Sequence, residues 1–220
     1  MKTLVIAPHP DDEILGVGGT LLKRKSQGHE LAWVIVTKPS TILNWTSSQI
    51  SNRQSQIKEI SKKIGFDKVY QLDFPAARLS QENMPLLIKS INNSINDFCP
   101  DEIFFPHIGD VHSDHQIVHK AVISSTKSFR NLYLKRLIVY ETLSETEYGL
   151  DKSKVFFPNL YIDISNFLTK KINLIKIYSS EIEKFPFPRS EEAIKSLAKY
   201  RGSSCNCFAA EAFEILKQIE

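Results

Sequence analysis

The chain has 220 residues, of which 42% are hydrophobic and 24% are charged, an ordinary balance for a globular protein. This composition excludes a mainly disordered chain, a collagen-like repeat and a disulfide-rich miniprotein. The 28 basic and 25 acidic residues give a net charge of +3, which is too small and too scattered to indicate a nucleic-acid partner. The length suits one sizeable domain, so we expect residues 1–220 to form a single domain.

The cysteines and the apolar runs indicate where such a chain resides. An odd number of cysteines that includes a C-x-C pair is poor material for a disulfide framework, so Cys99, Cys205 and Cys207 are expected to be reduced thiols. The apolar run Leu4–Ala7 is shorter than a signal-peptide core, and no stretch approaches the roughly 20 apolar residues that span a bilayer. These features predict a cytoplasmic protein without a transmembrane segment.

Short apolar runs that predict strands alternate along the chain with longer segments of helical period. Strands are expected at Leu4–Ala7, Leu31–Thr37, Val69–Leu72, Ile103–Phe105, Leu134–Tyr140 and Leu160–Ile164. Helices are expected at Ile14–Gln27, Asn52–Ile64, Gln81–Phe98, Ser113–Phe129, Ser165–Lys184, Glu191–Tyr200 and Ala209–Ile219. The stretch Thr142–Pro158 is irregular and is expected either to cover a pocket and help to choose the substrate or to make a subunit contact.

This alternation predicts the fold class. Strands separated by helices imply right-handed crossovers, a mostly parallel sheet and helices on both faces, which is a Rossmann-like three-layer α/β fold. The glycine-rich piece Gly16–Thr20 does not match the dinucleotide-binding fingerprint, because its glycines lie inside a predicted helix and not in the turn after the strand. A nucleotide cofactor is therefore not favoured.

Two polar segments each follow a predicted strand and open a predicted helix. They are His9-Pro10-Asp11-Asp12-Glu13 and His112-Ser113-Asp114-His115. Because the carboxyl ends of parallel strands lie at one edge of a sheet, these two segments are expected to meet in space.

Together the two segments offer the side chains of a metal site. His9 and Asp12 lie about one helical turn apart and can point at one position, and His115 can come from the other loop. Two imidazoles and one carboxylate are typical of catalytic zinc with an open position, where a water reaches a pKa of ~7. Asp11 is then placed to act as a general base, and Glu13 to orient it at best. Iron(II), cobalt and manganese accept the same ligands.

From the residues alone, His112 has an expected role in this site and two rival interpretations remain open. His112 can stabilise an oxyanion as a protonated imidazole, with Asp114 holding its ring. His112, His115 and His119 also share one helical face, so that His115 and His119 form a rival ligand pair. The acidic run after Pro10 can equally be a helix N-terminus favoured by the helix dipole alone.

At these residues the sequence resembles the LmbE-like, or PIG-L-like, zinc-dependent N-deacetylases. The family motif A-H-P-D-D-E stands as Ala7–Glu13 with Pro8 inserted, the following glycines fit, and the motif H-x-D-H stands as His112–His115. The resemblance implies a metal held by His9, Asp12 and His115. It implies Asp11 as the general base, His112 as the group that stabilises the oxyanion or protonates the amine, and Asp114 as its partner. It leaves His119 a packing or outer-shell role.

The resemblance also suggests substrate contacts. It implies that Arg53 points at the substrate, although a structural arginine on a solvated helix face is the alternative. It implies that Asp73 and Arg78, in the loop after the third strand, bind sugar hydroxyls. The segment Tyr178–Glu181 is similar to a late serine–glutamine element, with Glu181 where glutamine is more usual.

We therefore expect a metal-dependent hydrolase that removes the acetyl group from an N-acetylated amino sugar, similar to N-acetylglucosamine and within a larger conjugate. Zinc is the expected cofactor, with Fe2+ possible, a small molecule is the expected partner, and a homo-oligomer is possible. The alternatives are a hydrolase for phosphoesters or non-sugar amides and a catalytically silent metal-binding scaffold. The presence of both Asp11 and His112 argues against the scaffold.

Overall fold

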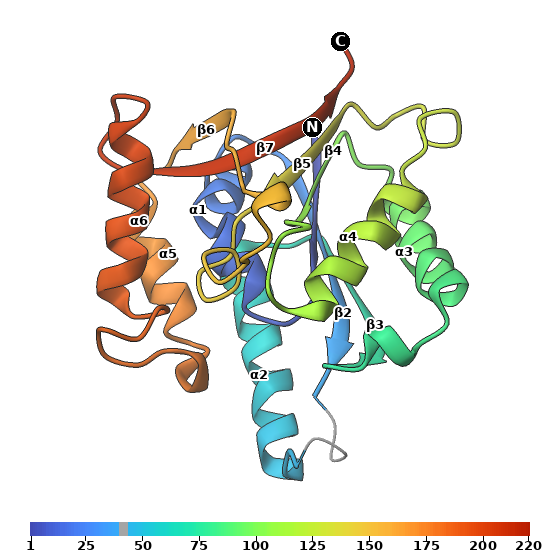
Figure 1. Ribbon diagram of the computed structural model, residues 1–220, viewed down its shortest axis with the longest axis horizontal. Helices are drawn as coiled ribbons and strands as arrows, with labels where there is room; N and C mark the ends of the chain where they lie inside the picture. Colours follow the sequence, from blue (N-terminus) through green and yellow to red (C-terminus); the bar gives the residue numbers. More distant parts are fainter. Residues whose placement is uncertain (40–43) are drawn as a thin grey trace.

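The computed structural model describes residues 1–39 and 44–220 and is built on one seven-stranded sheet (Figure 1). Its strands are β1 (Lys2–Ala7), β2 (Glu30–Lys38), β3 (Lys68–Pro75), β4 (Glu102–Pro106), β5 (Arg136–Tyr140), β6 (Leu160–Asp163) and β7 (Ala210–Gln218). The strand order is β3-β2-β1-β4-β5-β7-β6, and all neighbouring pairs up to β5 are parallel. Only β7 runs antiparallel to its neighbours, so the predicted mostly parallel sheet is confirmed.

Helices cover both faces of this sheet. They are α1 (Asp12–Ser26), α2 (Ser47–Ile64), α3 (Met84–Phe98), α4 (Ser113–Ser125), α5 (Leu168–Ile175) and α6 (Glu191–Ser203). Figure 1 shows α3 and α4 on one side of the sheet and α1, α5 and α6 on the other. The predicted three-layer α/β fold is thus confirmed.

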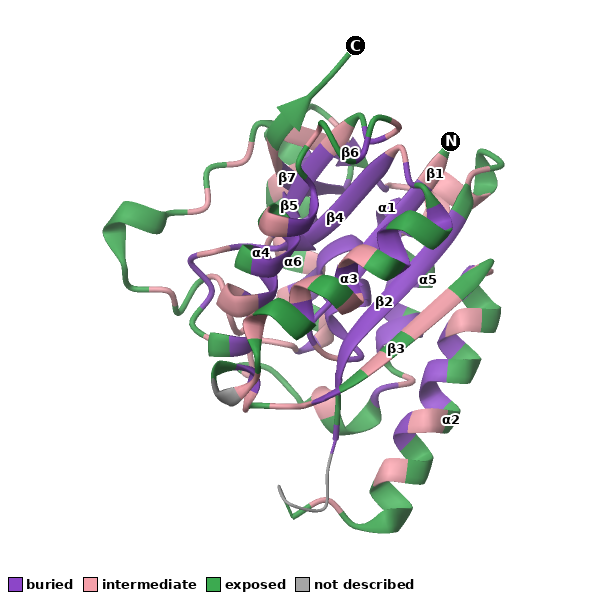
Figure 2. Ribbon diagram, turned by 90° about the vertical axis from the view of Figure 1, so that its right-hand side faces the viewer, coloured by how far each residue is buried: buried purple, intermediate pink, exposed green. Residues whose placement is uncertain are grey.

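The central strands carry continuous apolar runs, Leu4–Ala7 in β1 and Leu31–Val36 in β2, because both of their faces are buried there (Figure 2). In β1, Val5 and Ala7 belong to the core beneath α1, α2, α5 and α6, whereas Leu4 and Ile6 belong to the core beneath α3 and α4. The alternation of side chains along a strand therefore feeds two separate cores.

Two glycines of α1 allow this helix to lie close to its neighbours. A Cβ at Gly16 would overlap the ring of Tyr140, and a Cβ at Gly19 would lie 2.7 Å from Ile164. The glycine-rich piece lies inside a helix, as predicted, and serves close packing.

The predicted helix at Ala209–Ile219 is wrong, because this segment forms β7. Its alanines, glutamates and lysine favour a helix locally, but it pairs with β5 on one side and β6 on the other. Glu211 is buried there and accepts the backbone N–H groups of Gly19 and Thr20, while Phe213 enters the core. Pairing and burial thus override local propensity.

The predicted long helix Ser165–Lys184 is also wrong. Only Leu168–Ile175 is α-helical, and a short 3₁₀ helix follows at Ser179–Glu181. Between them the buried Tyr178 donates its hydroxyl to Glu13 at 2.9 Å. Leaving the helix at this point lets the following residues turn towards the carboxyl edge of the sheet.

The other predicted helices differ from the structure only at their ends. The helix α3 begins at Met84, after the cap Asn83, where the prediction began at Gln81. The helix α4 ends at Ser125, where the prediction ended at Phe129. The stop at Gly65 is confirmed, since this residue caps α2 with φ +85°.

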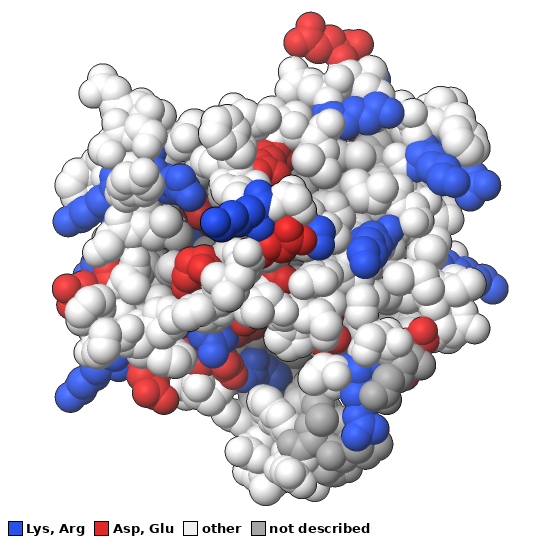
Figure 3. Space-filling view, viewed as in Figure 1, with Lys and Arg blue, Asp and Glu red and all other residues white. Residues whose placement is uncertain are grey.

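The surface carries charges of both signs, in agreement with the small net charge of the sequence. On the face shown in Figure 3, Lys and Arg side chains lie among Asp and Glu side chains in the described part of the chain. In the same described residues, no helix combines the length and the apolar character that a bilayer crossing needs.

Candidate metal centre and active site

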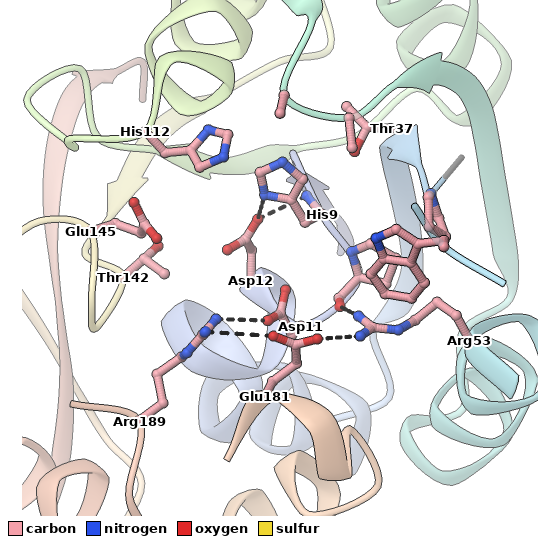
Figure 4. Close-up of a pocket in the computed structure, with 15 residues that line it drawn as sticks. His9, Asp11, Asp12, Thr37, Arg53, His112, Thr142, Glu145, Glu181 and Arg189 are labelled. Atoms are coloured by element: carbon pink, nitrogen blue, oxygen red, sulfur yellow. Dashed lines mark hydrogen bonds and ion pairs between the residues drawn. The ribbon is translucent and has the colours of Figure 1, made fainter. Parts of the chain in front are cut away.

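The structure brings the two predicted polar segments together at the carboxyl edge of the sheet. The first lies between β1 and α1, the second between β4 and α4, and β1 and β4 are adjacent parallel strands. The ring centroid of His9 lies 4.6 Å from that of His112 and 5.5 Å from that of His115. Figure 4 shows His9, Asp12 and His112 around one pocket.

His9, Asp12 and His115 form a cluster whose ligand atoms all lie within 4.8 Å of one another. Oδ2 of Asp12 lies 3.4 Å from Nδ1 of His9 and 3.3 Å from Nε2 of His115. Burial opposes ionisation of Asp12, but the charge and hydrogen bond of His115, together with those of His9, lower the pKa of this carboxyl. The cluster therefore presents an ionised oxygen and two ring nitrogens to one position.

The other nitrogen of each ligand histidine contacts a buried carboxylate. Nε2 of His9 lies 3.1 Å from Asp114, which is 105 residues away in the sequence, and Nδ1 of His115 lies 2.8 Å from Asp110. A proton on those nitrogens leaves a lone pair on the nitrogens that face Asp12, which is the arrangement that supports histidine ligands in metal sites. The side chains present thus fit a divalent cation.

A second cluster, of His9, His112 and Asp114, is geometrically able to hold a metal as well. Its carboxylate, however, already accepts the backbone N–H groups of Ala77 at 2.7 Å and Leu79 at 3.3 Å. These bonds hold Asp114 as a support for His9, so the first cluster is the better ligand set.

His119 belongs to neither cluster. Its Nδ1 lies 2.9 Å from the carbonyl oxygen of Pro106, and its ring packs against Phe105. The rival ligand pair with His115 is therefore not formed, and the packing role is confirmed.

The structure corrects the predicted pairing of Asp114 with the ring of His112. The contact between them is the backbone N–H of Asp114, which donates to Nδ1 of His112 at 3.1 Å as the cap of α4. Burial, with the charges of His9 and His115, lowers the pKa of His112 to about 4. His112 is therefore a neutral imidazole that carries its proton on Nε2, and it can still donate that proton in a hydrogen bond.

Asp11 lies at the junction of the β1 loop and α1 with φ +146°, a conformation that costs energy for a residue with a side chain. Its backbone N–H donates to Glu13, which in turn accepts the hydroxyl of Tyr178. Burial, and then the charge of Asp12, raise the pKa of Asp11 to about 7. The carboxyl is thus suited to exchange protons near neutrality. Glu13, for which an orienting role is expected, contacts the backbone of Asp11.

The cluster opens into a pocket of about 320 Å³. Its lining residues are His9, Pro10, Asp11, Asp12, Thr37, Pro39, Trp45, Arg53, Ala76, Ala77, His112, Thr142, Glu145, Glu181 and Arg189. The pocket lies at the sheet edge where parallel α/β folds bind ligands.

Arg53 is a buried pocket residue and does not lie on a solvated helix face. It is 5% exposed, donates to the carbonyl of Pro10 at 2.7 Å and to Ser180 at 3.2 Å, and pairs with Glu181. Its guanidinium also lies 5.4 Å from the ring centroid of Trp45.

The other two predicted substrate residues do not line the pocket. Because β3 extends to Pro75, Asp73 lies within the strand, at φ +61°, and its exposed carboxylate faces Lys38 at 3.7 Å. Arg78 lies in the turn before the 3₁₀ helix Leu79–Gln81. From this loop the pocket receives Ala76 and Ala77 instead.

The sequence did not single out the pocket residues Thr37, Trp45 and Arg189. Thr142 and Glu145 begin the irregular stretch after β5, so its predicted place over a pocket is confirmed for these residues. Thr142 is buried, and its Oγ1 has no hydrogen-bond partner among the described residues. Arg189 follows the proline-containing segment Phe185–Pro188, and nothing in this sequence indicates that the arginine side chain lies in the pocket.

Comparison with known families assigns the chain. Residues 4–126 match the PIG-L family, described as GlcNAc-PI de-N-acetylase. The chain belongs to this family. The match spans both ligand segments and agrees with the resemblance that the two motifs indicate.

Curated relatives of this PIG-L family member are named deacetylases. Diacetylchitobiose deacetylase of Thermococcus kodakarensis is 24% identical over 99% of the chain and 84% of its own length. The probable N-acetyl-alpha-D-glucosaminyl L-malate deacetylase 2 of Bacillus cereus is 28% identical over 54% of the chain and 58% of its own length. The conserved protein TT1542 of Thermus thermophilus has the same fold, with a TM-score of 0.79 at 24% identity over 99% of this chain and 96% of its own. The chain is thus an enzyme of the N-deacetylase type.

Proposed function

We propose that this protein is a zinc-dependent hydrolase that releases acetate from an N-acetylated amino sugar. His9, Asp12 and His115 are the proposed metal ligands, and Fe2+ is the alternative metal. The observation that carries the proposal is the pair of histidines that each contact a buried carboxylate and turn the other nitrogen towards Asp12.

A divalent cation bound there would polarise the amide carbonyl and acidify a water molecule. Asp11 lines the same pocket and takes a proton from the water. At the same time the oxygen of the water bonds to the carbonyl carbon of the amide. The N–H at Nε2 of His112 donates to the oxygen that becomes negative. When the carbon–nitrogen bond breaks, protonated Asp11 returns the proton to the nitrogen, and the products are the free amine and acetic acid, which ionises to acetate at neutral pH.

The substrate class follows from the family and from the pocket. The relatives are named for amino-sugar substrates, and a cavity of about 320 Å³ is of the size that holds a small ligand. The free thiols of Cys99, Cys205 and Cys207 support a reducing compartment such as the cytoplasm.

The test is acetate release from N,N′-diacetylchitobiose with metal-loaded protein, with chelated protein, and after addition of zinc or iron(II). We expect chelation to abolish release and one of the two metals to restore it. Asp12→Asn should abolish release, whereas Asp97→Asn, a matched change at an exposed carboxylate outside the pocket, should not. Full activity in chelated protein or in Asp12→Asn would refute the proposal.

A further inference from the structure

Glu181 lies between the two arginines of the pocket. One carboxylate oxygen pairs with Nη2 of Arg53, and the other lies 3.5 Å from Nη2 of Arg189 (Figure 4). Nη1 of Arg189 lies 3.3 Å from Asp11. The four side chains form a row in which cations and anions alternate.

The side chains of this row are largely shielded from water, so their charges interact strongly with one another. The side chains of Arg53, Glu181 and Arg189 are 6%, 19% and 23% exposed. At such burial an ion pair is screened far less than at the surface. Each guanidinium that lines the pocket is therefore neutralised by a carboxylate of the protein itself.

The rest of the lining adds negative charge. Glu145 is half-buried in the lining and forms no ion pair with a lysine or arginine among the described residues. Beyond the metal ligands, the described wall thus offers carboxylates and no uncompensated arginine or lysine.

From this arrangement we infer that Glu181 makes the pocket selective for N-acetylated sugars whose remainder is uncharged, and that it rejects conjugates bearing a carboxylate or phosphate. This inference rests on the proposed function and narrows its substrate. Sugar hydroxyls both donate and accept, so they can bond to the carboxylates and arginines of the row together. An anionic group away from the metal would meet the carboxylates of Glu181 and Glu145, while both pocket arginines are already paired with carboxylates.

The test compares two substrates that share the N-acetylglucosamine unit. N,N′-diacetylchitobiose is neutral, and N-acetylglucosaminyl malate carries two carboxylates. We expect the wild-type kcat/KM to favour the neutral substrate. Glu181→Gln keeps an oxygen for Arg53 but removes the negative charge. Because like-charge contacts oppose binding strongly, this variant should shift the ratio of kcat/KM for the two substrates towards the malate conjugate by about tenfold or more.

Glu145→Gln is the matched control, because it removes the same charge from the same pocket without freeing an arginine. The ratio should shift less in this variant than in Glu181→Gln. An unchanged ratio in Glu181→Gln, an equal shift in Glu145→Gln, or a wild-type preference for the malate conjugate would each overturn the inference. Thermal melting establishes that the variants are folded, and Glu181→Ala provides a second variant that should shift the ratio in the same direction.

A binding measurement separates this inference from the proposed function. Trp45 lines the pocket beside Arg53, whereas Trp33 is fully buried in the core, so tryptophan fluorescence should report ligands in the pocket. Titration of metal-free protein with each compound gives two dissociation constants without turnover. If neither compound is hydrolysed, the proposed function fails, and the ratio of these constants in wild type and Glu181→Gln still decides the inference.

Discussion

The carboxylate of Asp110 lies 2.8 Å from Nδ1 of His115, on the side of the ring away from Asp12. Asp110 is fully buried and also accepts the hydroxyl of Thr146 at 2.7 Å. Nothing in the sequence motif singles out Asp110. Its carboxylate nevertheless fixes the orientation of the His115 ring and favours a proton on Nδ1 of this proposed ligand.

Replacing this support should weaken metal binding. Asp110→Asn removes the charge that holds the N–H of His115, and loss of such a support costs about 10–100-fold in metal affinity. Competition with a chromophoric chelator would measure the dissociation constant. An affinity equal to that of wild type would show that Asp110 has no role in the site.

Loss of the proposed base should slow the reaction without releasing the metal. Asp11→Asn keeps a residue type that tolerates positive φ, but it cannot accept the proton from water. We expect kcat to fall by about 10²–10⁴-fold, the usual contribution of a general base. Metal content is measured on the same samples, and near wild-type turnover at full metal content would exclude Asp11 as the base.

Metal should stabilise the folded chain. A ligand that binds only the native state adds about 4 kcal/mol when its concentration is about a thousand times its dissociation constant. Addition of zinc to metal-free protein should therefore raise the melting temperature, and Asp12→Asn should remove this rise while Asp97→Asn retains it. A rise of the same size in Asp12→Asn would place the stabilising metal elsewhere.

Close packing in α1 should make Gly16 sensitive to substitution. In Gly16→Ala the new methyl group overlaps the ring of Tyr140, whose hydroxyl is held by the carbonyl of Ile6, and overpacking of this kind costs about 1–3 kcal/mol. Gly18→Ala meets only Ile14 and Lys171, at 3.2 and 3.4 Å, and gains helix propensity. Urea unfolding should show a loss for the first variant that exceeds any loss for the second.

The buried pair of Lys171 and Glu211 joins α5 to β7 at 2.6 Å. Lys171→Met leaves the Glu211 carboxylate buried without a cation, which costs about 3–5 kcal/mol of unfolding free energy. Adding Glu211→Gln to this variant should restore part of the loss, because the orphaned charge is removed. Equal stabilities of the single and double variants, measured in urea, would contradict this account.

The sequence alone was sufficient for the layered α/β fold and for the meeting of the two polar segments. Apolar runs such as Leu4–Ala7 read as buried strands, and strand ends in a parallel sheet share one edge, so both conclusions need only local patterns. The same local patterns failed at Ala210–Gln218, where helix-favouring residues became a strand because β5 and β6 offered partners on both sides.

Only the tertiary structure decided which side chains support the site. Asp110 orients His115, and the carboxylate of Asp114 contacts His9, whereas the ring of His112 accepts the backbone N–H of Asp114. Arg189, paired with Glu181, reaches Asp11 from a segment far along the chain. These contacts depend on the exact turn of loops and on where α5 ends. The hydrophobic periodicity of the sequence does not determine these contacts, because they depend on how whole helices, strands and loops pack together.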